Sequence, residues 1–309
     1  MPESEPITLL HVGFPKTATT ALQEHVFAGL PGICNLGKPN VPSSVRDALR
    51  HIASDDPGHF DRAHVTSLRQ AVREAKRDAR AIVISHEGMT GSRRTLGGPT
   101  RVMREKGFHA LRKATAERLH ESFHEDSVRI LFTIREQRSW LLSTFADLVL
   151  RVGLSMDFDD WIRRGLDSPD DFYADPNFDR TIALYESLWG SDRVHVFVYE
   201  EMVADPDRFA QRLADLGALP RIEVEHRMRV LPRTKTREQL SDPHNPYIVA
   251  ERGNPGKRHS TLPGVSIPTM LDAASEQAVV LHCAAGNTAI SKRLGISLEK
   301  WGYEVDSAS

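Results

Sequence analysis

The apolar run Ile7 to Val12 leads straight into Gly13-Phe14-Pro15-Lys16-Thr17-Ala18-Thr19-Thr20. Apolar residues then recur at helical spacing up to the stop signal Pro31-Gly32, so a strand passes through a tight turn into a helix. A helix N-terminus presents unpaired backbone N–H groups and a partial positive charge, and threonine hydroxyls add donors. The stretch predicts a phosphate-binding loop in which Lys16 adds a full charge. The alternative is a loop whose threonines only cap the helix.

Three further runs resemble buried strands: residues 81–84, 128–134 and 194–199. Their apolarity is continuous rather than alternating, which is typical of parallel strands buried on both faces. Helical patterns separate the runs, and another helix is expected after Pro268, towards Leu294. We therefore predict an α/β fold with a three-layer parallel sheet flanked by helices. One domain over residues 1–309 is expected, with loop insertions near 88–125 and 157–177.

Composition excludes several classes of protein. The 309 residues are 40% hydrophobic and 27% charged, and the net charge of −2 provides no basic field for nucleic acid. No run approaches the length of a membrane span. The two cysteines, Cys34 and Cys283, are too few for a disulfide framework, and the 14 histidines show no close ligand pattern. We expect a cytoplasmic protein without a metal, and a homo-oligomer is left open.

The loop around Lys16 differs from a Walker A loop, because only two residues separate Lys16 from Gly13 and Ala18 stands where the second glycine would be. It resembles the 5′-phosphosulfate loop of bacterial P-loop sulfotransferases, which use 3′-phosphoadenosine 5′-phosphosulfate (PAPS). That family typically has Pro-Lys-Ser/Thr-Gly-Thr-Thr, and Ala18 replaces the glycine. The resemblance implies a P-loop NTPase-like sulfotransferase fold. It also implies a cofactor-binding set of Gly13, Pro15, Lys16, Thr17, Ala18, Thr19 and Thr20, with Lys16 also catalytic.

A second motif points to the same family. Its 3′-phosphate site is an arginine at the end of a buried strand and a serine eight residues later. The run 128–134 ends in Arg135, and Ser143 has that spacing. An arginine fork and a hydroxyl suit a nucleotide phosphate that ATP lacks. The family usually has Asp-Pro after the arginine, whereas this chain has Glu136-Gln137.

The general base is sought in Ser85-His86-Glu87-Gly88, after the second buried run. Ligands of open α/β sheets bind at the carboxyl edge of the strands. Members of the family take the acceptor proton with His or Glu near this place. We prefer Glu87, because similar bacterial members often have Ser-x-Glu here, and keep His86 as the second candidate. The two side chains could also simply pair or cap the next segment.

The resemblance continues to the C-terminus. Tyr199-Glu200-Glu201-Met202 with Asp205-Pro206 is similar to the family's segment after its fourth core strand, and Lys257 and Arg258 are candidates for closing over the 3′-phosphate. The resemblance implies sulfuryl transfer to the hydroxyl of a carbohydrate, lipid or other small-molecule acceptor. The alternatives are a P-loop kinase, which would need magnesium and a Walker aspartate, and a non-catalytic nucleotide-binding protein.

Overall fold

Five parallel strands form the centre of the protein, in the order β2-β3-β1-β4-β5. A computed structural model describes residues 5–38, 40–90, 101–124, 127–152, 154, 156–231 and 270–306. The strands are β1 (Ile7–His11), β2 (Ile33–Asn35), β3 (Ala81–Ser85), β4 (Val128–Ile134) and β5 (Val194–Val198). Four of them lie on the four apolar runs, so the predicted parallel α/β sheet is confirmed.

The strand register brings three chain segments together at one edge. At the carboxyl end of β1, His11 pairs with Ser85 of β3 on one side and with Leu131 of β4 on the other. The chain thus leaves β1 and β3 at neighbouring points, while β4 continues past them from Leu131 to Ile134, and the order of the strands reverses around β1. In open α/β sheets this reversal point is where ligands bind.

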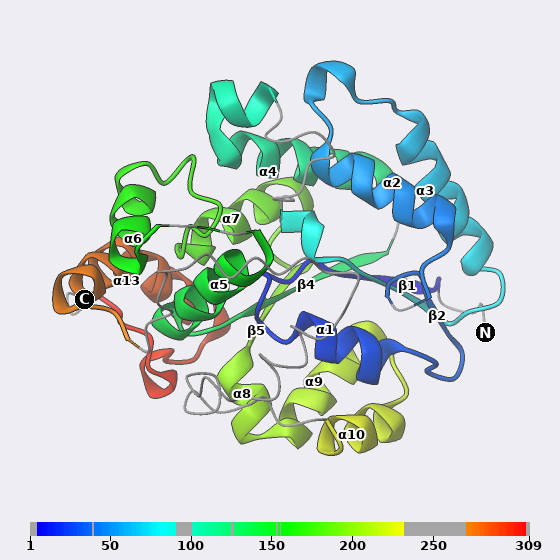
Figure 1. Ribbon diagram of the computed structural model, residues 1–309. Helices are drawn as coiled ribbons and strands as arrows, with labels where there is room; N and C mark the ends of the chain where they lie inside the picture. The colour runs from blue at the N-terminus through cyan, green and yellow to red at the C-terminus, as the bar shows by residue number, and fades with distance from the viewer. Residues whose placement is uncertain are drawn as a thin grey trace.

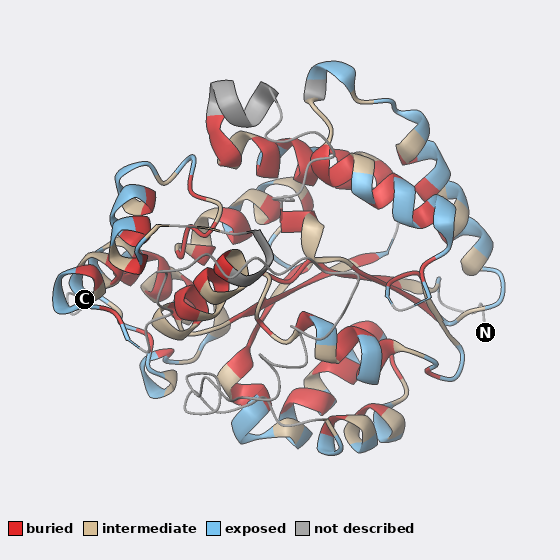
Figure 2. Ribbon diagram, in the orientation of Figure 1, coloured by how far each residue is buried: buried red, intermediate tan, exposed pale blue. Residues whose placement is uncertain are grey.

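Helices cover both faces of the sheet (Figure 1). The first face is packed by α2, α3, α4, α5, α7 and α13, and the second by η1, α8, α9 and α10. Alternate strand residues serve the two faces: Leu10 belongs to the first core and Leu9 to the second. Figure 2 shows buried residues along the strands and on the helix sides that face them. The predicted three layers follow from this alternation.

The helices have the following bounds: α1 (Thr19–Ala21), continued by the π-helical η1 (Leu22–Phe27), α2 (Ser43–Ser54), η2 (Pro57–His59), α3 (Ala63–Ala75), η3 (Glu87–Thr90), α4 (Arg101–Phe123), α5 (Gln137–Val152), α6 (Phe158–Asp167), α7 (Phe178–Trp189), α8 (Tyr199–Ala204), α9 (Pro206–Gly217), α10 (Arg221–Arg229), α13 (Ala273–Leu294) and η4 (Glu299–Trp301). The helix expected after Pro268 is α13, which ends at left-handed Gly295. Among these described helices, none is long and apolar enough to cross a membrane.

The structure differs from the sequence-based expectation where loops were predicted. Helix α4 fills 101–123 with a kink at Gly107, and α6 lies inside 157–177. Asp157 starts α6, because its side chain accepts hydrogen bonds from two backbone N–H groups of the first turn. The buried face of α6 consists of Phe158, Trp161, Ile162 and Gly165. Composition rich in Asp, Arg and Gly concealed this helical spacing.

Candidate functional site

The loop after β1 adopts a backbone conformation that few residues tolerate. Lys16 and Ala18 lie in the left-handed region, with φ of 65° and 66°. Left-handed residues within a loop build the concave sets of N–H groups that bind anions. The sulfotransferase motif has glycine at the position of Ala18, and the left-handed conformation explains that glycine, because glycine adopts positive φ without a steric cost. Gly13 is required by crowding, since a Cβ there would lie 2.7 Å from Thr19 Cγ2 and 2.8 Å from His11 Nε2.

Aromatic side chains hold the loop from below. The Trp140 indole Nε1 donates a hydrogen bond of 2.7 Å to the Pro15 carbonyl. Phe14 is buried and packs against Phe178, with ring centroids 4.6 Å apart. The Thr17 hydroxyl donates to the Phe14 carbonyl at 2.6 Å, so it braces the turn. The loop is therefore fixed by the core before any ligand binds.

Arg135 meets this loop from the end of β4. Its Nη1 donates to the Lys16 carbonyl at 3.3 Å, and its guanidinium lies 4.9 Å from the centre of the Tyr199 ring. The Arg135 Nε is buried and donates to no atom of the described residues. An arginine with a buried donor lacking a partner is suited to an anionic ligand. The two separate motifs of the sequence thus converge on one place.

One face of α5 points at the same loop. Trp140 and Asp147 both contact it, the latter through an ion pair of 3.2 Å with the Lys16 Nζ. Ser143 stands between them, three residues after Trp140 and four before Asp147, which places all three on one side of a helix. Ser143 is half-buried. The predicted hydroxyl thus shares the face that meets the loop.

Glu87 reaches the loop from β3. It begins η3, and its Oε1 accepts a hydrogen bond of 2.7 Å from the Thr19 hydroxyl. His86 is used differently, because its Nδ1 accepts a hydrogen bond of 3.0 Å from the Gly88 N–H. Burial and the charge of Lys38 lower the pKa of His86 to about 4. His86 is therefore neutral at pH 7, with its proton on Nε2. Of the two candidates, Glu87 is the one that contacts the loop.

Comparison with known proteins finds similarity in structure but not in sequence. No family model matches the chain, and no curated protein matches it. A sulfotransferase from Alicyclobacillus acidocaldarius has a similar structure, with a TM-score of 0.54 and 11% sequence identity. The alignment covers 95% of this chain and 98% of that one. The chain has a sulfotransferase fold.

In this sulfotransferase fold, Glu136-Gln137 stands where the motif of the resembling family has Asp-Pro. Glu136 caps α5, since its carboxylate accepts from the N–H groups of Arg138 and Ser139, each at 2.9 Å. Gln137 is the first residue of α5 and is buried, and its side-chain amide pairs with that of Asn287 on α13. Glu136 therefore provides the N-terminal cap of α5, and Gln137 adds hydrogen bonds to the C-terminal helix α13.

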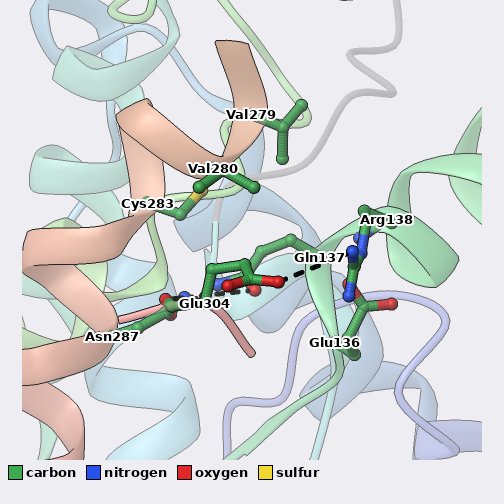
Figure 3. Close-up of a pocket in the computed structure, with 8 residues that line it drawn as sticks. All are labelled: Glu136, Gln137, Arg138, Val279, Val280, Cys283, Asn287 and Glu304. Atoms are coloured by element: carbon green, nitrogen blue, oxygen red, sulfur yellow. Dashed lines mark hydrogen bonds and ion pairs between the residues drawn. The ribbon is translucent and has the colours of Figure 1, made fainter. Parts of the chain in front are cut away.

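A small cavity lies beside this tie (Figure 3), lined by residues that include Cys283, Glu304 and the Gln137–Asn287 pair. Its volume of about 10 Å³ is close to the least that holds one water molecule. It is far too small for a nucleotide. The cavity belongs to the packing of α13 against the start of α5 and is not a second ligand site.

The backbone just after Arg135 has a support of its own. A carboxylate oxygen of Glu200 accepts a hydrogen bond of 3.0 Å from the Glu136 N–H, and the Tyr303 hydroxyl donates to the other oxygen at 3.1 Å. Burial raises the pKa of Glu200. Tyr199 and Glu200, which the sequence marked only by resemblance, thus hold Arg135 and the residue that follows it.

Beneath the loop lies a buried histidine at the end of β1. The His11 Nδ1 is 2.7 Å from the Ser85 Oγ, which also accepts from Gln23 Nε2 at 3.0 Å. His11 is 1% exposed, and burial lowers its pKa to about 3. The imidazole is therefore neutral at pH 7. It joins β1 to β3 directly below Gly13.

This burial predicts acid sensitivity. His11 and His86 have folded-state pKa values below the ordinary 6.5, so the unfolded chain binds more protons as the pH falls. The contribution of each histidine to the free energy of unfolding is complete above about pH 6.5 and decreases below it. Between pH 7 and pH 5 the loss is about 2 kcal/mol per histidine. Urea unfolding at both pH values should show a loss about 2 kcal/mol smaller in His11→Gln than in the wild type, because the substitution removes only the contribution of His11. His59→Gln, at a side chain 80% exposed, should keep the wild-type loss; an equal loss in all three proteins would contradict this explanation.

The structure also assembles three groups that sequence spacing did not connect: His51, Asp55 and His64. The two imidazole rings stack with centroids 4.0 Å apart and planes 7° apart, and His51 is hydrogen-bonded to Asp55 at 2.8 Å. A metal bound by ring nitrogens lies in the plane of each ring. Two stacked, nearly parallel planes share no such point, so the cluster is not a formed metal site. The expectation of no metal stays a prediction.

The remaining predicted residues are placed as follows. Thr20 is exposed at the start of α1. Lys257 and Arg258 lie outside the described residues. The residues that sequence reasoning missed are Trp140 and Asp147 as partners of the loop, and the contact of Tyr199 with Arg135 was not predicted. Helical spacing from Ser143 could have marked Trp140 and Asp147, since both lie within one turn of it.

Proposed function

We propose that the chain is a sulfotransferase that moves a sulfuryl group from PAPS to the hydroxyl of a carbohydrate, lipid or other small molecule. The observation that supports this most is the contact between Arg135 and the Lys16 carbonyl, at 3.3 Å. It joins a loop suited to a 5′-phosphate to an arginine suited to a 3′-phosphate. The sulfotransferase fold agrees with this assignment.

The residues would divide the work in a simple way. A bond forms between the acceptor oxygen and sulfur, while the bond from sulfur to the 5′-phosphate oxygen breaks, and adenosine 3′,5′-bisphosphate leaves. Lys16 stabilises the negative charge that grows on the leaving oxygen. Backbone amides of the loop, including those of Thr19 and Thr20, and the Thr20 hydroxyl hold the 5′-phosphate, because the hydroxyls of Thr17 and Thr19 already donate to the Phe14 carbonyl and to Glu87. Arg135 with Ser143 holds the 3′-phosphate.

Glu87 would take the acceptor proton. Its carboxylate lies 2.7 Å from the Thr19 hydroxyl, so it is already at the loop where transfer occurs. The lone pair of His86 Nδ1 is used by the Gly88 N–H, and the other ring nitrogen carries the proton. The imidazole therefore has no lone pair to offer. A positioned base contributes about 10²- to 10⁴-fold in rate.

Ligand preference tests the proposal. Thermal unfolding should be followed while adenosine 3′,5′-bisphosphate, ADP or ATP is titrated into separate samples. A ligand that binds only the folded state stabilises it, by about 2.7 kcal/mol at a hundred times its dissociation constant. We expect the bisphosphate to raise the midpoint at concentrations where ADP and ATP do not. Equal or greater stabilisation by ADP or ATP would favour the kinase alternative.

A further inference from the structure

The turn that carries Glu87 is held from behind by two side chains distant in sequence. The Tyr185 hydroxyl, from α7, donates to the Met89 carbonyl. Arg112, from α4, donates from Nε to the Thr90 carbonyl at 3.0 Å. Within the turn, the Thr90 hydroxyl donates to the Glu87 carbonyl at 3.1 Å. The C-terminal half of η3 is thus linked to two helices of the core, and Thr90 connects it back to Glu87.

Both anchors are buried. Tyr185 is 0% exposed and Arg112 is 4% exposed. Burial raises the pKa of Tyr185, so its hydroxyl stays protonated and remains a donor. A buried guanidinium carries a large desolvation cost, and replacing it by apolar groups is often neutral or stabilising. Arg112 uses its donors on two backbone carbonyls, those of Thr90 and Tyr173, the latter at 2.8 Å.

A buried carboxylate balances the charge of Arg112. Asp175 is 1% exposed and accepts hydrogen bonds from His282 Nε2 at 2.8 Å and from Arg180 Nη1 at 3.0 Å. Burial alone would raise the pKa of Asp175, but the bonds from His282 and the Asn177 N–H hold it below its usual value. The anchor of the turn therefore reaches α13, which carries His282.

We propose that Tyr185 and Arg112 are positioning residues for Glu87, which fix η3 so that the Glu87 carboxylate meets the Thr19 hydroxyl at the loop. The role of Glu87 as the base rests on the proposed function, whereas the hydrogen bond between Thr19 and Glu87 does not. Displacing a catalytic group by about 1 Å costs about 10²-fold in rate. A loosened turn should impair proton removal and leave the donor site unchanged, because among the described residues neither Arg135 nor Lys16 is hydrogen-bonded or ion-paired with η3.

The test measures how strongly Thr19 and Glu87 depend on each other. Thr19→Val, Glu87→Ala and the double variant form a double-mutant cycle on the unfolding midpoint in urea, which isolates the pairwise interaction. The cycle is repeated in the Tyr185→Phe background. If Tyr185 only stabilises the fold, Tyr185→Phe lowers all the midpoints together and leaves the interaction term between Thr19 and Glu87, which is the non-additive part of the cycle, unchanged. We expect the non-additive part to fall by at least half in Tyr185→Phe.

Thr181→Val is the matched control. Thr181 lies one turn before Tyr185 on α7, is 0% exposed, and its hydroxyl makes no hydrogen bond with any described residue. Its cycle should equal that of the wild type. Arg112→Met should behave as Tyr185→Phe does, with partial recovery in Arg112→Lys; if Arg112→Met does not fold, Tyr185→Phe decides alone. An unchanged cycle in Tyr185→Phe, or no coupling in the wild type, would overturn the proposal.

Turnover separates this proposal from the proposed function. In Tyr185→Phe, formation of adenosine 3′,5′-bisphosphate from PAPS should fall about tenfold, with the affinity for the bisphosphate unchanged. Loss of bisphosphate affinity with turnover retained would contradict the positioning role. If the wild type binds no bisphosphate, the proposed function fails, and the cycle of Thr19 with Glu87 still decides whether the turn is held as we infer.

Discussion

Lys16→Ala should lower the turnover of sulfuryl transfer by about 10²- to 10³-fold while the protein stays folded. The ammonium group lies at the loop where charge would grow on the leaving oxygen, and alanine cannot replace it. The Lys16 side chain is 32% exposed, and its ion pair with Asp147 is 3.2 Å long. The Asp147 side chain is only 9% exposed, so loss of the pair should destabilise the fold by about 1.5 to 3 kcal/mol, which is less than the stability of a typical domain, about 5 to 15 kcal/mol.

The measurement is the rate at which adenosine 3′,5′-bisphosphate forms from PAPS in the presence of mixed phenol and sugar acceptors. Lys113→Ala serves as control, because it removes a lysine from an exposed pair with Glu117 on α4. The control should keep wild-type turnover. Lys16→Arg restores the charge with a different geometry and should recover only part of the rate. Near-normal turnover in Lys16→Ala would remove Lys16 from the mechanism.

The core of the sheet could be predicted because its strands are buried on both faces. Continuous apolar runs such as Val128–Ile134 have few other stable arrangements, and the sequence prediction matches that strand residue for residue. Strand β2 was missed, since Ile33–Asn35 has three residues at the sheet edge and is only half-buried. Short edge strands leave too weak an apolar signal to distinguish them from a turn.

The candidate site divides in the same way. Lys16 and Arg135 follow strands directly, and the parallel register alone brings the ends of β1 and β4 together. The resemblance to the two sulfotransferase motifs predicted their convergence, and the pairing of β1 with β4 gives the physical reason for it. Tyr185 of α7 donates to the Met89 carbonyl in η3, and this contact depends on how α7 packs on the sheet. A local pattern holds no information about such packing, so this partner emerged only from the structure. Helical spacing could have placed Asp147 on the face of Ser143, but not its ion pair with Lys16.

The preference for Glu87 over His86 as the proposed base could be predicted from the sequence only in part. The two residues are adjacent, and the sequence offered both at the same turn. The choice depends on one backbone hydrogen bond, from the Gly88 N–H to His86 Nδ1, which uses the lone pair that a base would need. A Cβ at position 88 would lie 2.9 Å from that nitrogen, so the contact requires glycine. The glycine in the sequence was visible, but its purpose was not.

Arg135→Ala should weaken the binding of adenosine 3′,5′-bisphosphate by about 10- to 100-fold, since hydrogen bonds to a charged group are each worth about 1.5 to 3 kcal/mol. AMP, which lacks the 3′-phosphate, should bind the variant nearly as well as the wild type. Arg135→Lys keeps the charge but loses the planar fork, so its affinity for the bisphosphate should lie between those of the wild type and Arg135→Ala. Calorimetric titration of each protein with both nucleotides provides the comparison.

The use of two nucleotides separates two ways in which Arg135 could act. Its Nη1 supports the Lys16 carbonyl at 3.3 Å, so its removal could also disturb the loop that holds the 5′-phosphate. Damage to the loop would weaken AMP and the bisphosphate equally. Loss of a direct contact with the 3′-phosphate weakens only the bisphosphate. Equal losses would thus leave Arg135 as a support of the loop, and unchanged affinity for the bisphosphate would show that the 3′-phosphate lies elsewhere.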